Sequence, residues 1–278
     1  MKRTNESGIA DQEFCNVPVA LTIAGSDCSA GAGLQADLKT FSAFGVFGLT
    51  AVTCVVAEVP GKVSRLAGID PGLVREQIEL CLAHFPVGAI KTGLLFSTEI
   101  VEMVVEILQK SATNIPLVVD PVMVATSGDA LLRPEAIDAY RERLFSRATL
   151  VTPNMAEAAI FSGRSVRTRA EMRLVGMELA EKYGSSFLIK GGHLDDRRAT
   201  DLLCRGGDVQ EFDGPFISGV STHGTGCSYA AAIAARLALG DSLAGAVAQS
   251  KDFVTRAIRK HFVWRKSGGQ LHALNHFR

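Results

Sequence analysis

Apolar residues fall into two kinds of segment that alternate along most of the chain. Short continuous apolar runs predict strands at residues 17–24, 49–57, 87–91, 116–120, 149–152 and 186–190. Apolar residues at helical spacing predict helices at residues 34–44, 73–84, 99–109 and 169–183. Strands that are apolar throughout and alternate with helices are typical of a parallel sheet covered on both faces. The pattern therefore predicts an α/β fold with a single doubly wound, mostly parallel sheet flanked by helices.

Two short runs depart from this alternation. Residues 200–204 and 209–212 flank the sequence Arg205-Gly-Gly-Asp208, which predicts a short antiparallel hairpin at an edge of the sheet. Two longer helices are expected after the hairpin, at residues 226–239 and 242–260.

No linker-like break divides the central part of the chain, so residues 17–264 are expected to form one domain. Residues 1–16 are polar and lack the apolar core of a secretion signal, which predicts a flexible N-terminal extension. Residues 265–278 show no clear periodicity and predict a C-terminal tail. The expected organisation is one domain between two terminal segments.

Composition argues against several classes of function. The 278 residues are 47% apolar and 21% charged, which is ordinary for a globular protein. A net charge of zero gives no basic excess for nucleic acid, and no apolar run reaches the roughly 18 residues that span a bilayer. The six cysteines form no C-x-x-C pair, which indicates reduced thiols and a cytoplasmic protein. The expected partner is a small-molecule substrate, and the expected assembly is a homodimer.

Polar residues and glycines follow most of the predicted strands. Ligands of a parallel sheet bind where the carboxyl ends of its strands meet. The residues at these ends include Gly25, Glu58, Lys91, Asp120, Asn154 and Lys190. Asp120 could hold a metal or orient a phosphate, but it also begins an Asp-Pro turn, and Lys190 could meet a phosphate or simply be solvated. Asn154 and Glu157 fit water-mediated Mg²⁺ coordination and a capping box equally well.

The segment Ser221-Thr-His-Gly-Thr-Gly-Cys-Ser228 runs into an alanine-rich helix. Gly224 and Gly226 let the backbone approach a ligand, and the helix start directs N–H groups and a positive dipole end toward an anion. Cys227 lies in that field, so its thiol is expected to ionise easily and to act as a base or nucleophile. A glycine turn with a small buried cysteine explains the same residues, so both interpretations stay open.

A second glycine segment, Gly31 to Ala36, fits the dinucleotide fingerprint G-x-G-x-x-A, and Glu58 ends the next predicted strand. The fingerprint should begin directly at the strand end, whereas Gly31 lies six residues beyond Gly25. An NAD-binding oxidoreductase is therefore the less favoured alternative. No Walker A sequence occurs, which argues against a P-loop kinase.

Six segments carry a more specific signal because of their order along the chain. They are Leu21-Thr-Ile-Ala-Gly-Ser-Asp27, Gly31-Ala-Gly-Leu-Gln-Ala-Asp-Leu-Lys39, Asp120-Pro-Val-Met123, Thr152-Pro-Asn154 with Glu157, Lys190-Gly-Gly-His193, and Thr222-His-Gly-Thr-Gly-Cys227. Together they resemble the hydroxymethylpyrimidine and phosphomethylpyrimidine kinases of thiamine biosynthesis, in the ribokinase-like superfamily. The resemblance covers about residues 17–262. It implies ATP with Mg²⁺, and phosphoryl transfer to the pyrimidine hydroxymethyl group and then to its monophosphate.

The resemblance also implies roles for individual residues. Backbone N–H groups of Gly224, Thr225, Gly226 and Cys227 would form an anion hole, with Cys227 as the base for the acceptor. The residues implied to meet the ATP phosphates or Mg²⁺, the metal partly through water, are Asp120, Asn154, Glu157, Lys190 and Thr225. The residues implied to line the pyrimidine pocket are Gly25, Asp37, Leu94 and Val122. Adenine contacts are expected only in the segment after the predicted hairpin.

The sequence departs from the family where the acceptor is recognised. Family members usually have Ala-Gln-Asn-Thr after the second strand, with the glutamine amide on the ring, whereas this chain has Ala57-Glu-Val-Pro60. An ionised Glu58 only accepts hydrogen bonds, so it would favour the exocyclic amine or a protonated ring nitrogen. Leu94 stands where methionine is common. A pyridoxine or pyridoxal kinase of the same superfamily therefore stays open, as does a catalytically silent ligand-binding protein.

Overall fold

The structure is a computed structural model that describes residues 16–123, 134–192, 198–220, 223–266 and 269–277. The extension predicted at residues 1–16 lies outside the described residues except for Asn16, and so do Ser221 and Thr222 of the glycine segment. Among the helices that are described, none is long and apolar enough to cross a membrane.

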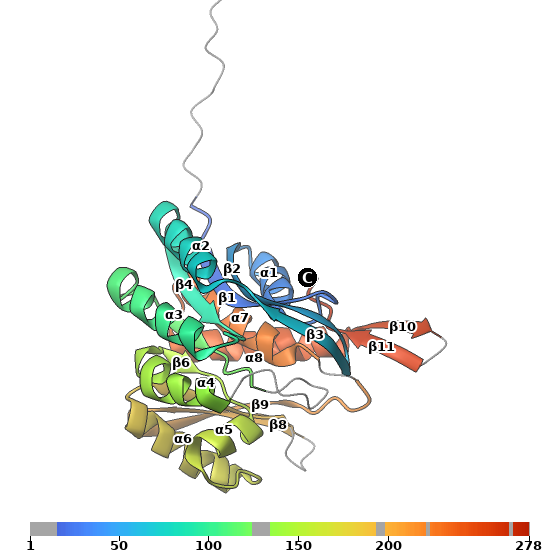
Figure 1. The fold of residues 1–278 in the computed structure, drawn as a ribbon. Coiled ribbons are helices and arrows are strands. Elements are labelled where there is room, and N and C mark those ends of the chain that lie inside the picture. The colour runs from blue at the N-terminus through green and yellow to red at the C-terminus, as the bar shows by residue number, and fades with distance from the viewer. Residues whose placement is uncertain (1–15, 124–133, 193–197, 221–222, 267–268, 278) are drawn as a thin grey trace, which may run out of the picture.

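One central sheet contains nine strands in the order β3-β2-β1-β4-β5-β6-β7-β8-β9 (Figure 1). The strands are β1 (Val19–Asp27), β2 (Phe47–Val59), β3 (Lys62–Gly68), β4 (Val87–Thr92), β5 (Leu117–Val119), β6 (Leu150–Val151), β7 (Ser186–Gly191), β8 (Arg198–Arg205) and β9 (Asp208–Pro215). The strands from β2 through β7 are parallel, and β3, β8 and β9 add antiparallel edges. The predicted mostly parallel sheet with an edge hairpin is therefore confirmed.

Helices cover both faces of this sheet (Figure 1). The face packed by α1 (Gly33–Ala43) also carries α7 (Thr225–Ala238) and α8 (Leu243–Arg259). The opposite face carries α2 (Pro71–His84), α3 (Thr98–Ser111), α4 (Pro134–Ala139), α5 (Met155–Ser162) and α6 (Arg169–Tyr183). A π-helical turn at Tyr140–Leu144 and a 3₁₀ turn at Phe145–Arg147 continue α4. The protein is thus a three-layer α/β domain.

The strands of the sheet centre contain continuous apolar runs because both of their faces are buried. In β1, Leu21 and Ile23 pack into the core beneath α2 and α3, whereas Ala20 faces the core under α1 and α7. β7 repeats this alternation, with Phe187 on the first face and Leu188 on the second. Side chains alternate between the faces of a strand, so a strand covered on both sides needs apolar residues at every position.

Two features of the fold were not predicted from the sequence. The strand β3 is mostly exposed, so it lacks the continuous apolar run by which the buried strands were found. The segment expected to be an irregular tail contains part of a hairpin, formed by β10 (Phe262–Lys266) and β11 (Gly269–Ala273), which projects from the domain (Figure 1). After that hairpin, Leu274 and His276 are buried.

The order of the strands determines where a ligand can bind. The chain passes from β1 through α1 to β2 on one side, and β4 lies on the other side of β1. The crevice outside the carboxyl ends of neighbouring strands at such a reversal is where open α/β sheets bind their ligands. Here that crevice lies at the ends of β1 and β4, beside the start of α7.

Candidate functional site

Two cavities lie at the carboxyl ends of the strands. The smaller cavity, about 170 Å³, is lined by residues from the ends of β1, β2 and β4 and from the glycine segment before α7. The larger cavity, about 870 Å³, lies over β7 and between α5, α7 and α8. Asn154, Lys190 and Gly226 line both cavities. A ligand in one cavity therefore meets a ligand in the other at these three residues.

An ion pair marks the place where the cavities meet. The ammonium of Lys190 lies 3.0 Å from Oδ1 of Asp120, which also accepts a hydrogen bond from the hydroxyl of Thr152. Burial opposes the charge of Lys190, but Asp120 and Glu157 outweigh it and raise the pKa of the lysine. Lys190 is therefore a fixed cation at the junction, available to an anionic ligand.

The start of α7 faces this cation. Gly224, the residue that precedes the helix, has φ +79°, and a side chain there would collide with the backbone of Gly31. A Cβ atom on Gly226 would stand 3.2 Å from the ammonium of Lys190. The first hydrogen bond of the helix runs from the amide of Ser228 to the carbonyl of Gly224, so the amides before it have no acceptor within the helix. The predicted anion hole and Lys190 are thus brought together.

Thr225 presents its side chain to the larger cavity. Its hydroxyl oxygen is buried and has no hydrogen-bond partner among the residues that the structure describes, although an unsatisfied buried hydroxyl is costly. A ligand oxygen in the larger cavity would supply the missing partner. This arrangement fits the role in phosphate binding predicted for Thr225.

The thiol of Cys227 lines the smaller cavity and is partly buried. Burial raises the pKa of Cys227 to about 12, and the opposing effect of the Lys91 ammonium is weaker. The prediction that the helix start makes this thiol ionise easily is therefore wrong as far as the protein's own groups determine its pKa. Loss of water around the sulfur outweighs the Lys91 charge and the hydrogen bond from the backbone of Gly33, which favour the thiolate.

Asn154 and Glu157 form the capping box that the sequence left open. The side chain of Asn154 accepts the amide of Glu157 at 2.9 Å, and the carboxylate of Glu157 accepts the amide of Asn154 at 2.8 Å. Burial raises the pKa of Glu157 to about 7, although Lys190 opposes the shift. Asp120 and Glu157 line the smaller cavity together, so two carboxylates and an amide oxygen stand near the cavity junction. Oxygen donors of this kind suit Mg²⁺ held through water.

The predicted substrate pocket is only partly as expected. Gly25, Glu58, Leu94 and Val122 line the smaller cavity. Asp37 does not: its carboxylate is fully buried and binds the ammonium of Lys91 at 2.8 Å. The placement of Asp37 in the pocket wall is therefore wrong, since Lys91 stands between Asp37 and the cavity. Lys91 was noted at a strand end in the sequence but was given no role there, and the structure places it in the lining of the smaller cavity.

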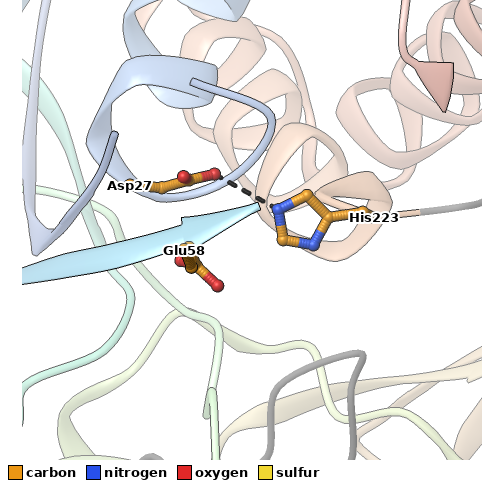
Figure 2. A group of neighbouring side chains, drawn as sticks. All are labelled: Asp27, Glu58 and His223. Atoms are coloured by element: carbon orange, nitrogen blue, oxygen red, sulfur yellow. Dashed lines mark hydrogen bonds and ion pairs between the residues drawn. The ribbon is translucent and has the colours of Figure 1, made fainter. Parts of the chain in front are cut away.

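Asp27 and His223 also belong to the site and were assigned no role from the sequence. Figure 2 shows Asp27, at the end of β1, bonded to the ring of His223 from the segment before α7, with Glu58 of β2 close to both. One ligand atom of each residue lies within 4.8 Å of the other two. Chain positions 27 and 223 lie far apart, so no local pattern could have paired them.

The larger cavity has mostly apolar walls. Val166, Phe216, Ile217, Val254 and Ile258 contribute to its lining. The segment after β9 supplies two of them, as expected for the adenine side. An apolar cavity with a cation and open amides at one end suits a nucleotide, whose base needs apolar contacts and whose phosphates need positive partners.

Comparison with known proteins agrees with this arrangement. Residues 27–272 match the family described as phosphomethylpyrimidine kinase. The chain belongs to this family. It is 41% identical over 241 residues to the hydroxymethylpyrimidine/phosphomethylpyrimidine kinase of Rhizobium meliloti, which covers 86% of this chain and 90% of that protein. It is 40% identical over 239 residues to the thiamine biosynthesis bifunctional protein ThiED of Geobacter sulfurreducens, with 86% of this chain aligned; the alignment spans about half of that protein, 49%.

Solved structures of phosphomethylpyrimidine and pyridoxal kinases have the same fold. The pyridoxal kinase from Staphylococcus aureus in complex with AMP-PCP and pyridoxal gives a TM-score of 0.84 at 34% identity, over 94% of this chain and 93% of that one. The phosphomethylpyrimidine kinase from Clostridium difficile gives 0.77 at 38% identity, over 87% and 99%. The predicted ribokinase-like fold is confirmed.

Membership in the phosphomethylpyrimidine kinase family makes the protein a phosphotransferase. The predicted enzyme class is confirmed, and the oxidoreductase and the silent binding protein are set aside. The apparent dinucleotide fingerprint has a structural explanation as well, because Gly33 opens α1 with φ +59° and a Cβ atom there would stand 2.6 Å from the carbonyl of Gly25. These glycines allow the loop to pack against β1.

Proposed function

We propose that this kinase transfers the γ-phosphoryl group of ATP to the hydroxymethyl group of 4-amino-5-hydroxymethyl-2-methylpyrimidine, and then a second phosphoryl group to the monophosphate. The observation that carries this proposal is the meeting of the two cavities at Lys190 and Gly226. ATP in the larger cavity and the acceptor in the smaller one would face each other across the start of α7. In-line transfer requires this arrangement.

The nucleotide side uses groups that are already fixed. Lys190 would neutralise phosphate charge, and the hydroxyl of Thr225 would donate to a phosphate oxygen. Asp120, Asn154 and Glu157 would hold Mg²⁺, partly through water, and the metal would neutralise charge on the phosphates. The buried carboxyl of Glu157 fits this role because a cation would favour its ionised form.

The acceptor side combines the anion hole with Cys227. Amides of Gly224 to Cys227 would receive the transferring phosphoryl group, and the sulfur of Cys227 would take the proton of the acceptor hydroxyl. The transition state of phosphoryl transfer is loose, so stabilising its charge matters more than early removal of that proton. A thiol with a raised pKa is compatible with such a transition state because the proton need not be removed early. Lys91 beside it favours the thiolate that forms.

A second acceptor is favoured by one specific observation. The S. aureus pyridoxal kinase, whose solved structure contains AMP-PCP and pyridoxal, has the same fold as this chain. Pyridoxal kinase activity is therefore the alternative function of this site. Both acceptors present a hydroxymethyl group on an aromatic ring, so they share the phosphate machinery and differ at Glu58.

Turnover with each acceptor tests the proposal. ATP consumption is measured with hydroxymethylpyrimidine, its monophosphate and pyridoxal, each with wild type and with Lys190→Met as the control that the turnover belongs to this site. Phosphorylation of the pyrimidine and of its monophosphate by wild type only is the expected result. Turnover of pyridoxal alone would replace the pyrimidine by the second acceptor.

The assembly and location of the enzyme are proposals as well. A homodimer is expected, and light scattering of the purified protein measures its mass directly. A cytoplasmic location is supported by the free thiols of Cys28, Cys54, Cys81, Cys204 and Cys227.

A further inference from the structure

Among the described residues, none forms a hydrogen bond or ion pair with the carboxyl group of Glu58, which lies in the smaller cavity. The pairing between β2 and β3 shifts register between Ala57 and Glu58, and such irregularities redirect a side chain. Glu58 is half-buried and lines the smaller cavity, yet its carboxylate makes no hydrogen bond or ion pair with any described residue. Polar groups withdrawn from water are normally paired, so a ligand that fills the cavity and displaces its water should supply a partner for this carboxylate.

The neighbouring carboxylate, Asp27, is hydrogen-bonded to described residues of the protein, unlike that of Glu58. It accepts hydrogen bonds from the amides of Ser29, Gly31 and Ala32, from the hydroxyl of Ser29 and from the ring of His223. Burial would raise its pKa, but these bonds outweigh burial and lower the pKa of Asp27 to about 2. Asp27 is therefore a permanent negative charge, and its Oδ2 atom already accepts four of these hydrogen bonds, which disfavours a metal ion between that oxygen and Glu58.

His223 is held against Asp27 by packing. A Cβ atom on Gly31 would stand 2.8 Å from the ring, so glycine at that position makes room for it. An ionised carboxylate only accepts, so the ring nitrogen Nε2 donates to Asp27 across 3.2 Å. Asp27 and His223 together form one wall beside Glu58 (Figure 2).

This surrounding determines how Glu58 binds protons. Burial raises the pKa of Glu58, the charge of Asp27 raises it further, and His223 opposes the shift. The other titratable groups that line the cavity are Lys91, Asp120, Glu157, Lys190 and Cys227. An unpaired carboxylate beside a permanent negative charge gains most from a ligand that brings a proton or a positive charge.

We infer that Glu58 recognises the acceptor by sharing one proton with it, on an edge where a ring nitrogen stands next to an exocyclic amine. One carboxyl oxygen accepts from the amine, and the proton lies between the other oxygen and the ring nitrogen. A neutral carboxyl with a neutral ring and a carboxylate with a protonated ring form the same two hydrogen bonds. Above the pKa values of both partners, binding takes this proton up from water.

The inference rests on the proposed pyrimidine acceptor and explains how this chain selects it. A glutamine amide carries its own N–H donor and needs no added proton for the same two contacts. Glutamate in this place makes acceptor binding dependent on pH, which glutamine does not. Pyridoxal has no amine next to its ring nitrogen, so it cannot form both contacts with Glu58.

Proton uptake on acceptor binding tests the inference directly. Titration calorimetry with the hydroxymethylpyrimidine at pH 8, in two buffers of different ionisation enthalpy, gives the number of protons taken up. An alkaline pH is chosen because burial and Asp27 raise the pKa of Glu58, and the proton is taken up only where the free carboxyl is ionised. Wild type should take up about one proton more per acceptor than Glu58→Gln. Leu94→Met changes the same pocket without a titratable group, and its proton number should equal that of wild type.

The pH dependence of kcat/KM for the acceptor gives a second reading at saturating ATP and Mg²⁺. Wild type should lose about tenfold per pH unit on the alkaline side, and Glu58→Gln should lack that limb. Effects of Glu157 or Cys227 appear in both proteins and cancel in the comparison. Equal proton numbers and equal profiles in an active pyrimidine kinase overturn the inference alone. Turnover of pyridoxal without turnover of the pyrimidine overturns the proposed acceptor, and the inference with it.

Discussion

The ammonium of Lys91 lies 2.8 Å from the carboxylate of Asp37, and both side chains are completely buried beneath the smaller cavity. Thr22 donates a second hydrogen bond to the same carboxylate. Burial opposes the charge of Lys91, but Asp37 outweighs it and raises the pKa of the lysine. This pair places a permanent cation at the end of β4, next to Cys227.

Removal of the cation alone should destabilise the fold. Lys91→Met leaves the Asp37 carboxylate buried without its partner, and breaking a buried pair in this way costs about 3–5 kcal/mol. Lys91→Met combined with Asp37→Leu removes both charges and should recover much of that loss. Urea unfolding followed by circular dichroism measures both. Lys110→Met is the control, because its ion pair with Glu106 is exposed and should matter little. Equal losses of unfolding free energy in the single and the double variant would contradict the view that the unpaired carboxylate of Asp37 destabilises the fold.

The anion hole should matter more to catalysis than the thiol. Gly226→Val would crowd the ammonium of Lys190 and distort the start of α7, so kcat should fall by about 10²–10³, the loss that removal of one oxyanion donor causes. Cys227→Ser replaces the thiol by a hydroxyl at the same place, so its kcat should fall less. Gly245→Val in the first turn of α8 is the control for helix damage, and it should keep wild-type kcat. A harmless Gly226→Val in a folded protein would refute the assignment.

Burial on both faces explains which parts of the fold were predictable. Strands such as β4 and β7 contain continuous apolar runs, so their existence could be inferred from the sequence. In β3, Lys62 and Arg65 face solvent, and the strand is held by pairing with β2, which leaves no apolar signature. In the β10–β11 hairpin the apolar side chains of Val263, Trp264 and Leu271 are exposed. Pairing between backbones carries no pattern that a single sequence reveals.

The residues of the site likewise include some that the sequence reveals and others that it does not. Asp120 and Lys190 were found because both end buried strands, and the carboxyl ends of parallel strands converge. Asp37 lies within α1, and whether it reaches a cavity depends on how that helix packs over β1 and β4. The contact between Asp27 and His223 joins residues 196 positions apart. Such contacts follow from packing of distant segments, so they required the structure.

Glu157 should make stability decline with pH through the neutral range. Its pKa is raised from 4.5 to about 7, so the stability that its protonated form contributes is complete below pH 4.5 and is lost as the pH rises to 7. Relative to Glu157→Gln, wild type should lose on the order of 3 kcal/mol over this window. Urea unfolding at pH 4.5, 5.5 and 7.5 measures the difference.

The capping box at the start of α6 provides the control for Glu157. Glu171 has the same position in that helix but is exposed, and its pKa is lowered by hydrogen bonds from the amides of Arg167 and Thr168. Wild type should therefore show no loss of stability relative to Glu171→Gln as the pH rises above 4.5. If wild type loses stability with rising pH relative to both glutamine variants, the capping geometry and not burial governs the pKa of Glu157.

The buried C-terminal segment should make the protein sensitive to acid. The hydroxyl of Ser228, one residue after Cys227, lies 2.8 Å from Nε2 of His276. Burial lowers the pKa of His276 from 6.5 to about 4, with a smaller contribution from Lys39, so the neutral ring is the folded form. The stability that depends on the neutral ring is complete above pH 6.5 and is lost as the pH falls to 4, since the unfolded chain binds the proton more readily.

His276→Gln keeps a polar partner for Ser228 but cannot take up a proton. Relative to this variant, wild type should lose about 3 kcal/mol between pH 6.5 and 4, which corresponds to the shift of its pKa. Urea unfolding across this range measures the loss, and His84→Gln, at an exposed histidine, should behave as wild type. Parallel pH curves for wild type and His276→Gln would show that the ring is already protonated in the fold. In that case the ring cannot be the neutral partner that ties the chain end to the first turns of α7.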